Sequence, residues 1–256
     1  MPYNAAIPSI ALAVACLAPV AALSAPNMCA ATSGGNITTV LELYTSEGCS
    51  SCPPADRWLS GLNLQDRAGT PLVVQAFHVG YWDYIGWVDR FANPAHTTRQ
   101  RRIAQWNNQR SIYTPQAVLN GRDWRDWHKA GSSIAGAADS AKVGISLKKT
   151  GADQFEAMVT ALPGAPGNWG AYWTVTESGH SSRVKAGENA GEFLTHDHVV
   201  RQYVEAGTFD TAAGAAQKLT LRSIAAEGGR AQRVNLVVFD SRNGRTLQAV
   251  SASCTG

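Results

Sequence analysis

The chain has 256 residues, of which 45% are hydrophobic and 16% are charged. This balance is typical of a globular protein with a sizeable core and argues against wholesale disorder. Lys and Arg number 22 against 19 Asp and Glu, which leaves a net charge of +3. So small a charge does not indicate nucleic acid or an anionic membrane as the main partner.

An apolar segment at residues 7–23 is followed by the small residues Ser24 and Ala25. This pattern predicts a signal peptide over residues 1–25 and a secreted or periplasmic mature protein. With about 17 residues and two prolines, the segment is short for a membrane span, so we expect no stable membrane insertion. Its removal discards Cys16 and leaves an even number of cysteines in a compartment where disulfides persist.

Residues 26–142 alternate between strand-like and helical patterns, which favours an α/β layer with parallel strand pairs. Strands are predicted at Val40–Tyr44, Leu72–Phe77 and Gln116–Leu119, and helices at Pro53–Arg67, Pro94–Arg110 and Ser132–Ala141. Asn120-Gly121 is a hairpin turn signal directly after the third strand.

Residues 143–256 contain short strand patterns separated by turn signals, which indicates a second domain that is an all-β, immunoglobulin-like sandwich. The predicted strands are Val143–Lys148, Phe155–Ala161, Ala171–Thr176, His198–Val204, Lys218–Ser223, Val234–Phe239 and Thr246–Val250.

The chemistry is concentrated in Cys49-Ser50-Ser51-Cys52, where a predicted strand meets a predicted helix. Two cysteines at this spacing can form a small reducible disulfide ring, and a helix N-terminus can stabilise a thiolate there. Because Pro53 and Pro54 lack N–H groups, we expect the helix to begin at Pro53 and to depress the Cys49 pKa only modestly. Pro53 is also expected to disfavour helical dihedral angles at Cys52.

The order of these elements resembles that of a thioredoxin fold, and several motifs are similar to those of a family of secreted bacterial thioredoxin-like proteins, the domain of unknown function 1223 family. The motifs are Tyr44–Asp56, Phe77–Val79, Tyr81–Trp87, Thr98–Gln100 and Thr114–Gln116, with looser similarity at 187–191 and 196–201. The resemblance implies an α/β thioredoxin-like domain over residues 26–142. It also implies that Pro115 is a cis proline that faces the disulfide and helps to dock substrate.

We therefore predict a thiol–disulfide oxidoreductase in which Cys49 attacks and Cys52 resolves. His78, at the end of a strand beside the one that leads to Cys49, is a candidate proton shuttle. Pro115 is the docking residue, and the candidate substrate-binding residues beside it are Thr114, Tyr81, Trp82 and Trp87. The alternative for the aromatic residues is a small buried core that holds a long loop in place. The expected partners are protein thiols and disulfides, and no oligomeric state is predicted.

Two other functions stay open. Cys49, Cys52 and His78 can supply ligands to copper or zinc in a metal-binding or delivery protein, whereas the oxidoreductase needs no cofactor beyond its disulfide. The same cysteine pair can also be a permanent structural disulfide in an interaction module.

Three further groups of polar residues have more ordinary interpretations. Glu47 and Asp83 are candidate proton-transfer carboxylates, for which the favoured interpretation is a loop position in contact with solvent. His196-Asp197-His198 can supply metal ligands, but without a third ligand in the local sequence we favour a structural turn or strand start. Cys29 and Cys254 lie near the ends of the mature chain, so a disulfide between them is expected to join those ends.

Overall fold

The computed structural model describes Met1 and residues 29–65, 71–137, 139–210 and 216–254; the predicted signal peptide lies outside these residues, apart from Met1. The described part contains α1 (Pro53–Ser60), α2 (Pro94–Trp106) and the short 3-10 helices η1 (Asp83–Ile85), η2 (Arg125–Lys129) and η4 (Glu227–Gly229). Its strands are β1 (Ala30–Thr32), β2 (Val40–Thr45), β3 (Val73–His78), β4 (Gln116–Leu119), β5 (Arg122–Asp123), β6 (Val143–Lys149), β7 (Gln154–Ala161), β8 (Asn168–Glu177), β9 (His180–Arg183), β10 (Phe193–His196), β11 (Val199–Asp210), β12 (Gln217–Arg222), β13 (Gln232–Asp240) and β14 (Thr246–Cys254).

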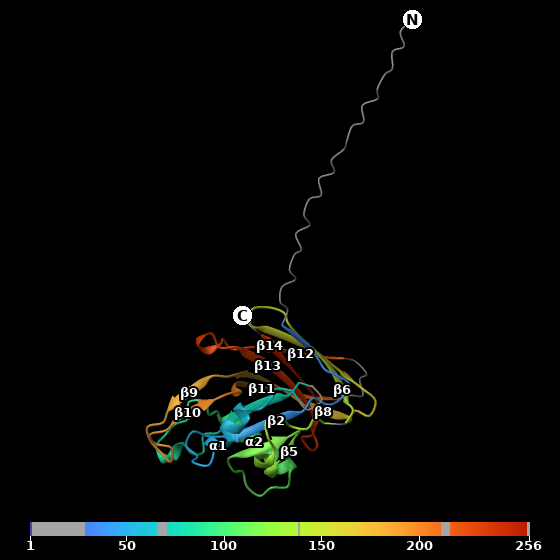
Figure 1. Cartoon of the computed structure of the whole chain (residues 1–256). Coiled ribbons are helices and arrows are strands. Elements are labelled where there is room, and N and C mark those ends of the chain that lie inside the picture. The colour runs from blue at the N-terminus through green and yellow to red at the C-terminus, as the bar shows by residue number, and fades with distance from the viewer. Residues whose placement is uncertain (2–28, 66–70, 138, 211–215, 255–256) are drawn as a thin grey trace.

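The predicted fold class, an α/β thioredoxin-like domain followed by an immunoglobulin-like sandwich, is wrong, because the protein is mostly β. Strands from both halves of the chain share one eight-stranded sheet, in the order β14-β13-β8-β11-β3-β2-β4-β5 (Figure 1). The join is made by β11, which pairs antiparallel with β8 and, at Val199 and Ala76, parallel with β3. Hydrophobic patterns identify strands but not their partners, so the sequence did not reveal this connection.

The strand predictions are largely confirmed. All the predicted strands are present, with ends displaced by a few residues, and the turn at Asn120-Gly121 joins β4 to β5. Strand β6 alternates buried and more exposed residues, as expected for a strand with one face on a core. The short strands β1, β5, β9 and β10 were not predicted.

The helix predictions were less accurate. Helix α1 ends at Ser60, well before the predicted Arg67, because the chain turns at Gly61. The predicted helix Ser132–Ala141 does not form in the part of this range that the structure describes, residues 132–137 and 139–141. The described backbone there is instead bonded to residues 35–39: Ala141 N–H donates to Gly35, and Ile37 N–H donates to Asp139.

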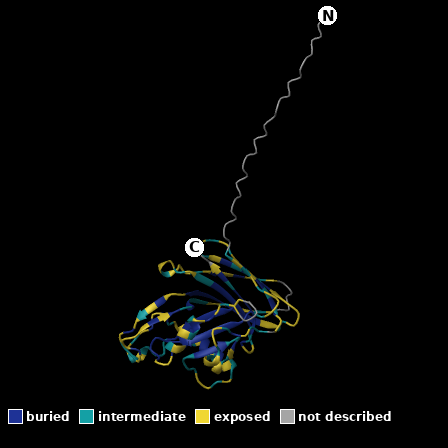
Figure 2. Ribbon diagram, viewed as in Figure 1, coloured by how far each residue is buried: buried dark blue, intermediate teal, exposed yellow. Residues whose placement is uncertain are grey.

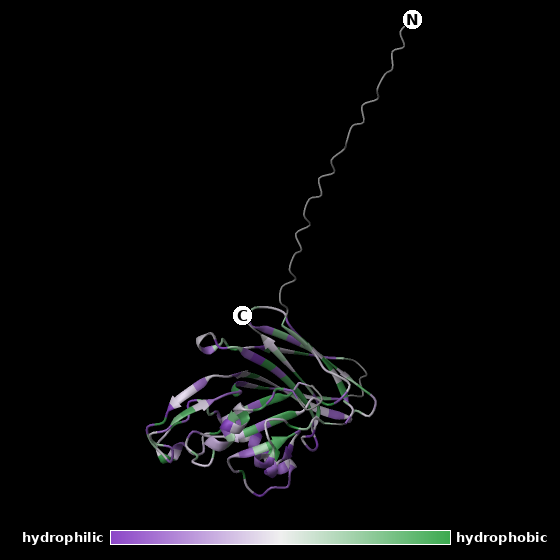
Figure 3. Ribbon diagram, viewed as in Figure 1, coloured by the Kyte–Doolittle hydropathy of each residue, from purple (hydrophilic) through white to green (hydrophobic). Residues whose placement is uncertain are grey.

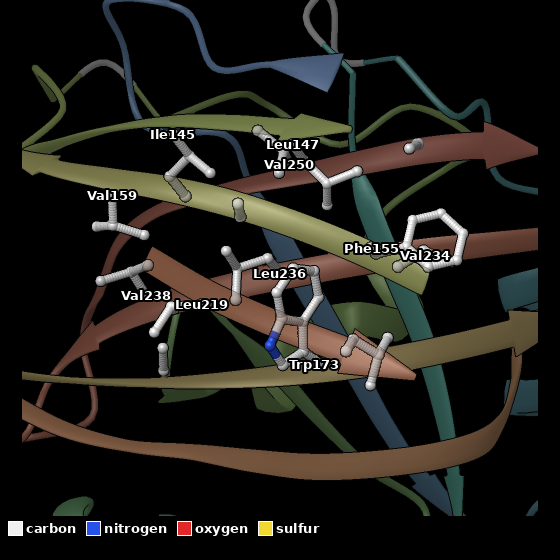
Figure 4. Close-up of a cluster of buried hydrophobic side chains, with 14 of the residues drawn as sticks. Ile145, Leu147, Phe155, Val159, Trp173, Leu219, Val234, Leu236, Val238 and Val250 are labelled. Carbon is white, nitrogen blue, oxygen red and sulfur yellow. The ribbon is translucent and has the colours of Figure 1, made fainter. Parts of the chain in front are cut away.

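The largest core lies between the four-stranded sheet β1-β6-β7-β12 and the part of the long sheet formed by β8, β13 and β14. Figure 4 shows Trp173 and Leu236 among side chains such as Ile145 and Leu219 from the opposite sheet. Two further cores cover the β2–β3–β4 region: α1 packs on one and α2 contributes Ile103 to the other. Buried residues and apolar residues follow the same strands in Figures 2 and 3. Among the described residues, no helix is long and apolar enough to cross a membrane.

Candidate functional site

Cys49 and Cys52 form a disulfide at the N-terminus of α1, with Cα atoms 5.4 Å apart. Helix α1 begins at Pro53 with Cys52 as its N-cap, as predicted. The expected non-helical dihedral angles at Cys52 are not found, since its φ of −79° and ψ of −37° are helical. A local turn outweighs the effect of Pro53: Cys52 N–H donates to the Cys49 carbonyl, and the Cys52 carbonyl accepts from Ala55 and Asp56.

Both cysteines are fully buried, although Ser50 and Ser51 between them are exposed. The cover includes the loop between β9 and β10, which reaches this site from 140 residues away along the chain. Asn189 in that loop donates its side-chain N–H groups to the carbonyls of Glu47 (2.8 Å) and Cys49 (3.0 Å). The Glu188 carboxylate accepts from the Ser50 N–H at 3.0 Å. Hydrogen bonds from the backbone and the side chain of Ser50 lower the Glu188 pKa.

The aromatic segment after β3, Tyr81–Trp87, lies against the loop that carries Cys49, here named the cysteine loop. A Cβ atom added at Gly48 would lie 2.9 Å from Trp82 Cβ, so Trp82 packs directly on the residue before Cys49. The Trp82 indole N–H donates to the Thr114 hydroxyl at 2.8 Å, and the peptide bond between Thr114 and Pro115 is cis. Trp82 thus places the Thr114-Pro115 pair beside the cysteine loop.

The other aromatic residues have different positions. The Trp87 indole donates to the Glu47 carboxylate at 2.7 Å, and Tyr81 packs beside the core that contains Phe77 and Ile103. Tyr84 is 81% exposed. The segment therefore combines partly buried anchors with at least one exposed ring, and the prediction that it binds substrate stays a prediction.

Five titratable side chains gather beneath the cysteine loop and the aromatic segment: Glu47, Asp56, His78, Asp89 and His196. We name them the buried acid–base cluster. Each is at most 6% exposed. They come from the loop before α1, from α1 itself, from the end of β3, from the loop after η1 and from the end of β10. The interpretation of Glu47 as a solvent-exposed loop residue is therefore wrong, since loops from both halves of the chain cover it.

Two hydrogen-bonded pairs organise this cluster. His78 Nδ1 lies 2.7 Å from Asp89 Oδ2, and His196 Nε2 lies 3.2 Å from Glu47 Oε1. Asp89 Oδ2 also accepts from the Glu47 backbone N–H at 3.0 Å, which ties the pairs together. The two imidazole rings meet edge to face, with centroids 4.9 Å apart.

These contacts perturb the pKa values. Burial opposes charge on His78, but the adjacent Asp89 carboxylate, together with Asp56 and Glu47, outweighs it and raises the His78 pKa. Burial works to raise the Asp89 pKa, yet His78 and two backbone N–H groups lower it overall. Asp56 differs, because burial dominates and raises its pKa despite the nearby His78 and His196. The cluster thus holds a carboxylate that resists ionisation beside one that favours it.

The sequence patterns assign no role to the site residues Asp56, Asp89 and Asn189, although Asp56 ends the motif Tyr44–Asp56. His196 belongs to His196-Asp197-His198, for which a structural turn or strand start is the favoured interpretation and metal binding the alternative. The available signal was weak: the looser family similarity at 187–191 and 196–201 includes Asn189 and His196. Their separation from Cys49 along the chain hides a proximity that only the tertiary fold creates.

Another group of ligand-type atoms occurs in the described chain at Glu177, His180 and Glu227, whose ligand atoms all lie within 4.8 Å of one another. Arginines already pair with these carboxylates: Arg201 lies 2.8 Å from Glu177 and 2.7 Å from Glu227, and Arg90 lies 3.0 Å from Glu227. We interpret this group as a salt-bridge network that links β8, β9 and β11.

Cys29 is disulfide-bonded. The following strand β1 lies near β14, which ends at Cys254. Proximity of these strands is compatible with the predicted Cys29–Cys254 disulfide, which stays a prediction because the side chain of Cys254 is outside the described residues.

The fold and site define a mostly β protein with a Cys-x-x-Cys disulfide at a helix N-terminus, above a buried acid–base cluster. The chain belongs to the family described as "Protein of unknown function (DUF1223)", which matches residues 40–239. The family membership predicted from the motifs is thereby confirmed.

Two solved structures are similar over most of this chain. Protein AGR_C_4864 from Agrobacterium tumefaciens is 25% identical, with a TM-score of 0.60 over 86% of this chain and 95% of that one. HBP35 of Porphyromonas gingivalis is 14% identical, with a TM-score of 0.56 over 86% of this chain and 76% of that one, a likeness of fold alone. No curated protein matches the chain.

Proposed function

We propose that the protein is a thiol–disulfide redox protein that works through Cys49 and Cys52. The observation that carries the proposal is the Cys49–Cys52 disulfide itself, which closes a four-residue loop at the N-terminus of α1. Cys49 is the attacking thiol, because it precedes the helix and has the Ser51 hydroxyl 3.4 Å from its sulfur. Cys52, the N-cap of the helix, is the resolving thiol.

The balance of the reaction is simple. A partner dithiol gives two electrons to the Cys49–Cys52 disulfide, whose S–S bond breaks, while a new S–S bond forms in the partner. Two protons accompany the electrons when both cysteines end as neutral thiols. In the reverse reaction the Cys49 and Cys52 thiols give two electrons to a partner disulfide, which is reduced to a dithiol while the Cys49–Cys52 bond forms again.

A partner protein must gain access to a disulfide that other residues of the chain cover. Because both cysteines are buried, the loop that contains Glu188 and Asn189 must move for a partner sulfur to reach Cys49. Thr114, Pro115 and Trp82 form the adjacent surface, and we assign substrate docking to them. We propose protein thiols or disulfides as substrates.

The proposed compartment is outside the cytoplasm. The apolar segment at residues 7–23 supports export, and a second disulfide at Cys29 is in keeping with an oxidising environment.

The test is a redox titration of the mature chain in glutathione and dithiothreitol buffers, with Cys49→Ser and Cys52→Ser as controls. We expect a midpoint between about −270 and −120 mV, the range of known dithiol enzymes, and thiol turnover that is lost in Cys49→Ser. A potential below about −300 mV without turnover would show that the disulfide is structural. Stoichiometric copper or zinc retained only by the reduced protein would favour the metal-delivery alternative.

A further inference from the structure

Three features around Asp56 point to proton transfer at the disulfide. The first is position. Asp56 follows Cys52 by four residues, Cys52 has helical dihedral angles, and Asp56 N–H donates to the Cys52 carbonyl at 3.1 Å. Residues four apart in a helix lie on the same face, so the Asp56 carboxylate and the Cys52 sulfur project to the same side of α1. Both residues are buried, with Asp56 6% exposed and Cys52 fully covered.

The second feature is an incomplete set of hydrogen bonds. His78 and His196 each use one ring nitrogen on a carboxylate, whereas His78 Nε2 and His196 Nδ1 are buried without a hydrogen-bond partner. His196 Nδ1 lies 3.7 Å from Asp56 Oδ2, beyond hydrogen-bond distance but within range of a strong charge interaction. A buried imidazole nitrogen with no partner is costly, and small movements toward Asp56 would give it one.

The third feature is the count of charges. The titratable groups that face Asp56 are His78 from β3, His196 from β10 and Asp89 from the loop after η1, the Thr45 hydroxyl at the end of β2 also lies near it, and Glu47 faces His196. Glu47 and Asp89 are each bonded to one imidazole, so Asp56 is the carboxylate left over. It is the member of the cluster best suited to change its protonation without breaking a pair.

From these features we propose that Asp56, positioned by His196, accepts the Cys52 proton when the disulfide forms and returns it when the disulfide opens. This inference rests on the proposed redox function and assigns a residue to its proton-transfer step. Burial disfavours a free thiolate at Cys52, so the thiol needs a nearby acceptor before it can attack. In the step, Cys52 S–H gives its proton to Asp56, and the sulfur attacks the Cys49 sulfur of a mixed disulfide. The Cys49–partner S–S bond breaks, and the partner leaves as a thiolate with the electron pair.

The experiment mixes the reduced mature chain with the aromatic disulfide 5,5′-dithiobis(2-nitrobenzoate) and follows thiolate release. Release of the first thiolate reports attack by Cys49, and release of the second reports attack by Cys52. Overall the protein loses two electrons and two protons, and the reagent is reduced to two aromatic thiolates. Both rates are measured from pH 5 to pH 9 for the wild type and for Asp56→Asn, His196→Gln and Asp83→Asn. The last is the control, because Asp83, the first residue of η1, carries a carboxylate outside the cluster that accepts from the Asp89 backbone N–H.

We expect Asp56→Asn to slow the second release by roughly 100-fold at pH 7, the lower end of general acid–base effects, and to leave the first release unchanged. The second release in this variant should then rise only as a cysteine thiol titrates, at about pH 8.5 or above. His196→Gln should shift the inflection of the wild-type profile, and Asp83→Asn should change neither rate. This separates proton transfer from a structural role, which would not alter the pH profile of one step alone.

A second release with wild-type rate and pH profile in Asp56→Asn would overturn the inference. If Asp56→Asn does not fold, His196→Gln decides by the same criterion, since an unshifted inflection would also overturn it. Failure of the proposed function looks different: the wild type itself would resist reduction or would not release the second thiolate.

Discussion

The buried ion pair between Glu42 and Arg99 makes a sharp prediction about stability. Glu42 lies on β2 and Arg99 on α2, and their side chains are 3% and 4% exposed. Arg99 Nε and Nη2 donate to the two carboxylate oxygens at 2.8 and 2.6 Å, which is a bidentate pair. The guanidinium also lies 3.8 Å from the ring centroid of Tyr172 on β8. This pair therefore joins α2 to strands from both halves of the chain.

Arg99→Met removes the cation and leaves the Glu42 carboxylate buried. Breaking such a pair on one side typically costs about 3–5 kcal/mol, because the remaining charge has lost its partner. Tyr44 and Tyr172 still donate to Glu42, at 2.7 and 3.2 Å, so we expect about 3 kcal/mol, the lower end of that range. With an m-value of about 2–3 kcal/mol/M, the urea midpoint should fall by about 1–1.5 M.

The assay is urea unfolding at pH 7, followed by tryptophan fluorescence. The exposed pair of Arg222 and Asp153 provides the control, because Arg222→Met removes a cation whose side chain is 78% exposed and should leave the midpoint unchanged. The double variant Glu42→Gln with Arg99→Met should be more stable than Arg99→Met alone, since no unpaired charge remains. Equal midpoint shifts for Arg99→Met and Arg222→Met would refute the reasoning.

Three further predictions address pH, backbone geometry and access to the disulfide. Burial lowers the pKa of His96 from 6.5 to about 4, so its contribution to stability is complete above pH 6.5 and is lost as pH falls toward 4, by about 3 kcal/mol. The urea midpoint of His96→Gln should therefore change less between pH 7.5 and 4.5 than that of the wild type. An equal change of the midpoint with pH in both proteins would contradict this. Gly121 has a φ of +80°, and an added Cβ would meet the Gly244 carbonyl, so Gly121→Ala should lower the free energy of unfolding by at least about 1–3 kcal/mol. A wild-type urea midpoint in that variant would count against the turn geometry. Asn189→Ala removes two bonds to the cysteine loop, and at about 1 kcal/mol each it should speed disulfide reduction by dithiothreitol by up to roughly 30-fold. An unaltered reduction rate would mean that this loop does not control access.

Local signals in the sequence predicted the start of the site correctly. Cys49-Ser50-Ser51-Cys52 followed by Pro53-Pro54 indicated a disulfide ring at the beginning of a helix, and both are present. These features depend on residues within one helical turn of each other, so short-range geometry is sufficient to predict them. The motif positions likewise identified the family.

Long-range pairing decided the remaining features. The alternation of strands and helices before residue 142 suggested an α/β domain, but β11 pairs with β3 and extends its sheet into the second half of the chain. Hydrophobic alternation is the same for a strand at an edge and for one that finds a distant partner, so the pattern alone could not distinguish them.

The sequence by itself determined where most strands lie, which two cysteines share a loop and how the helix after them begins. The tertiary structure decided what surrounds that disulfide. His196 and Asn189 reach it from positions about 140 residues away, and the resulting burial is what perturbs Asp56 and His78. Desolvation and charge interactions depend on distance in space, which a single sequence does not contain.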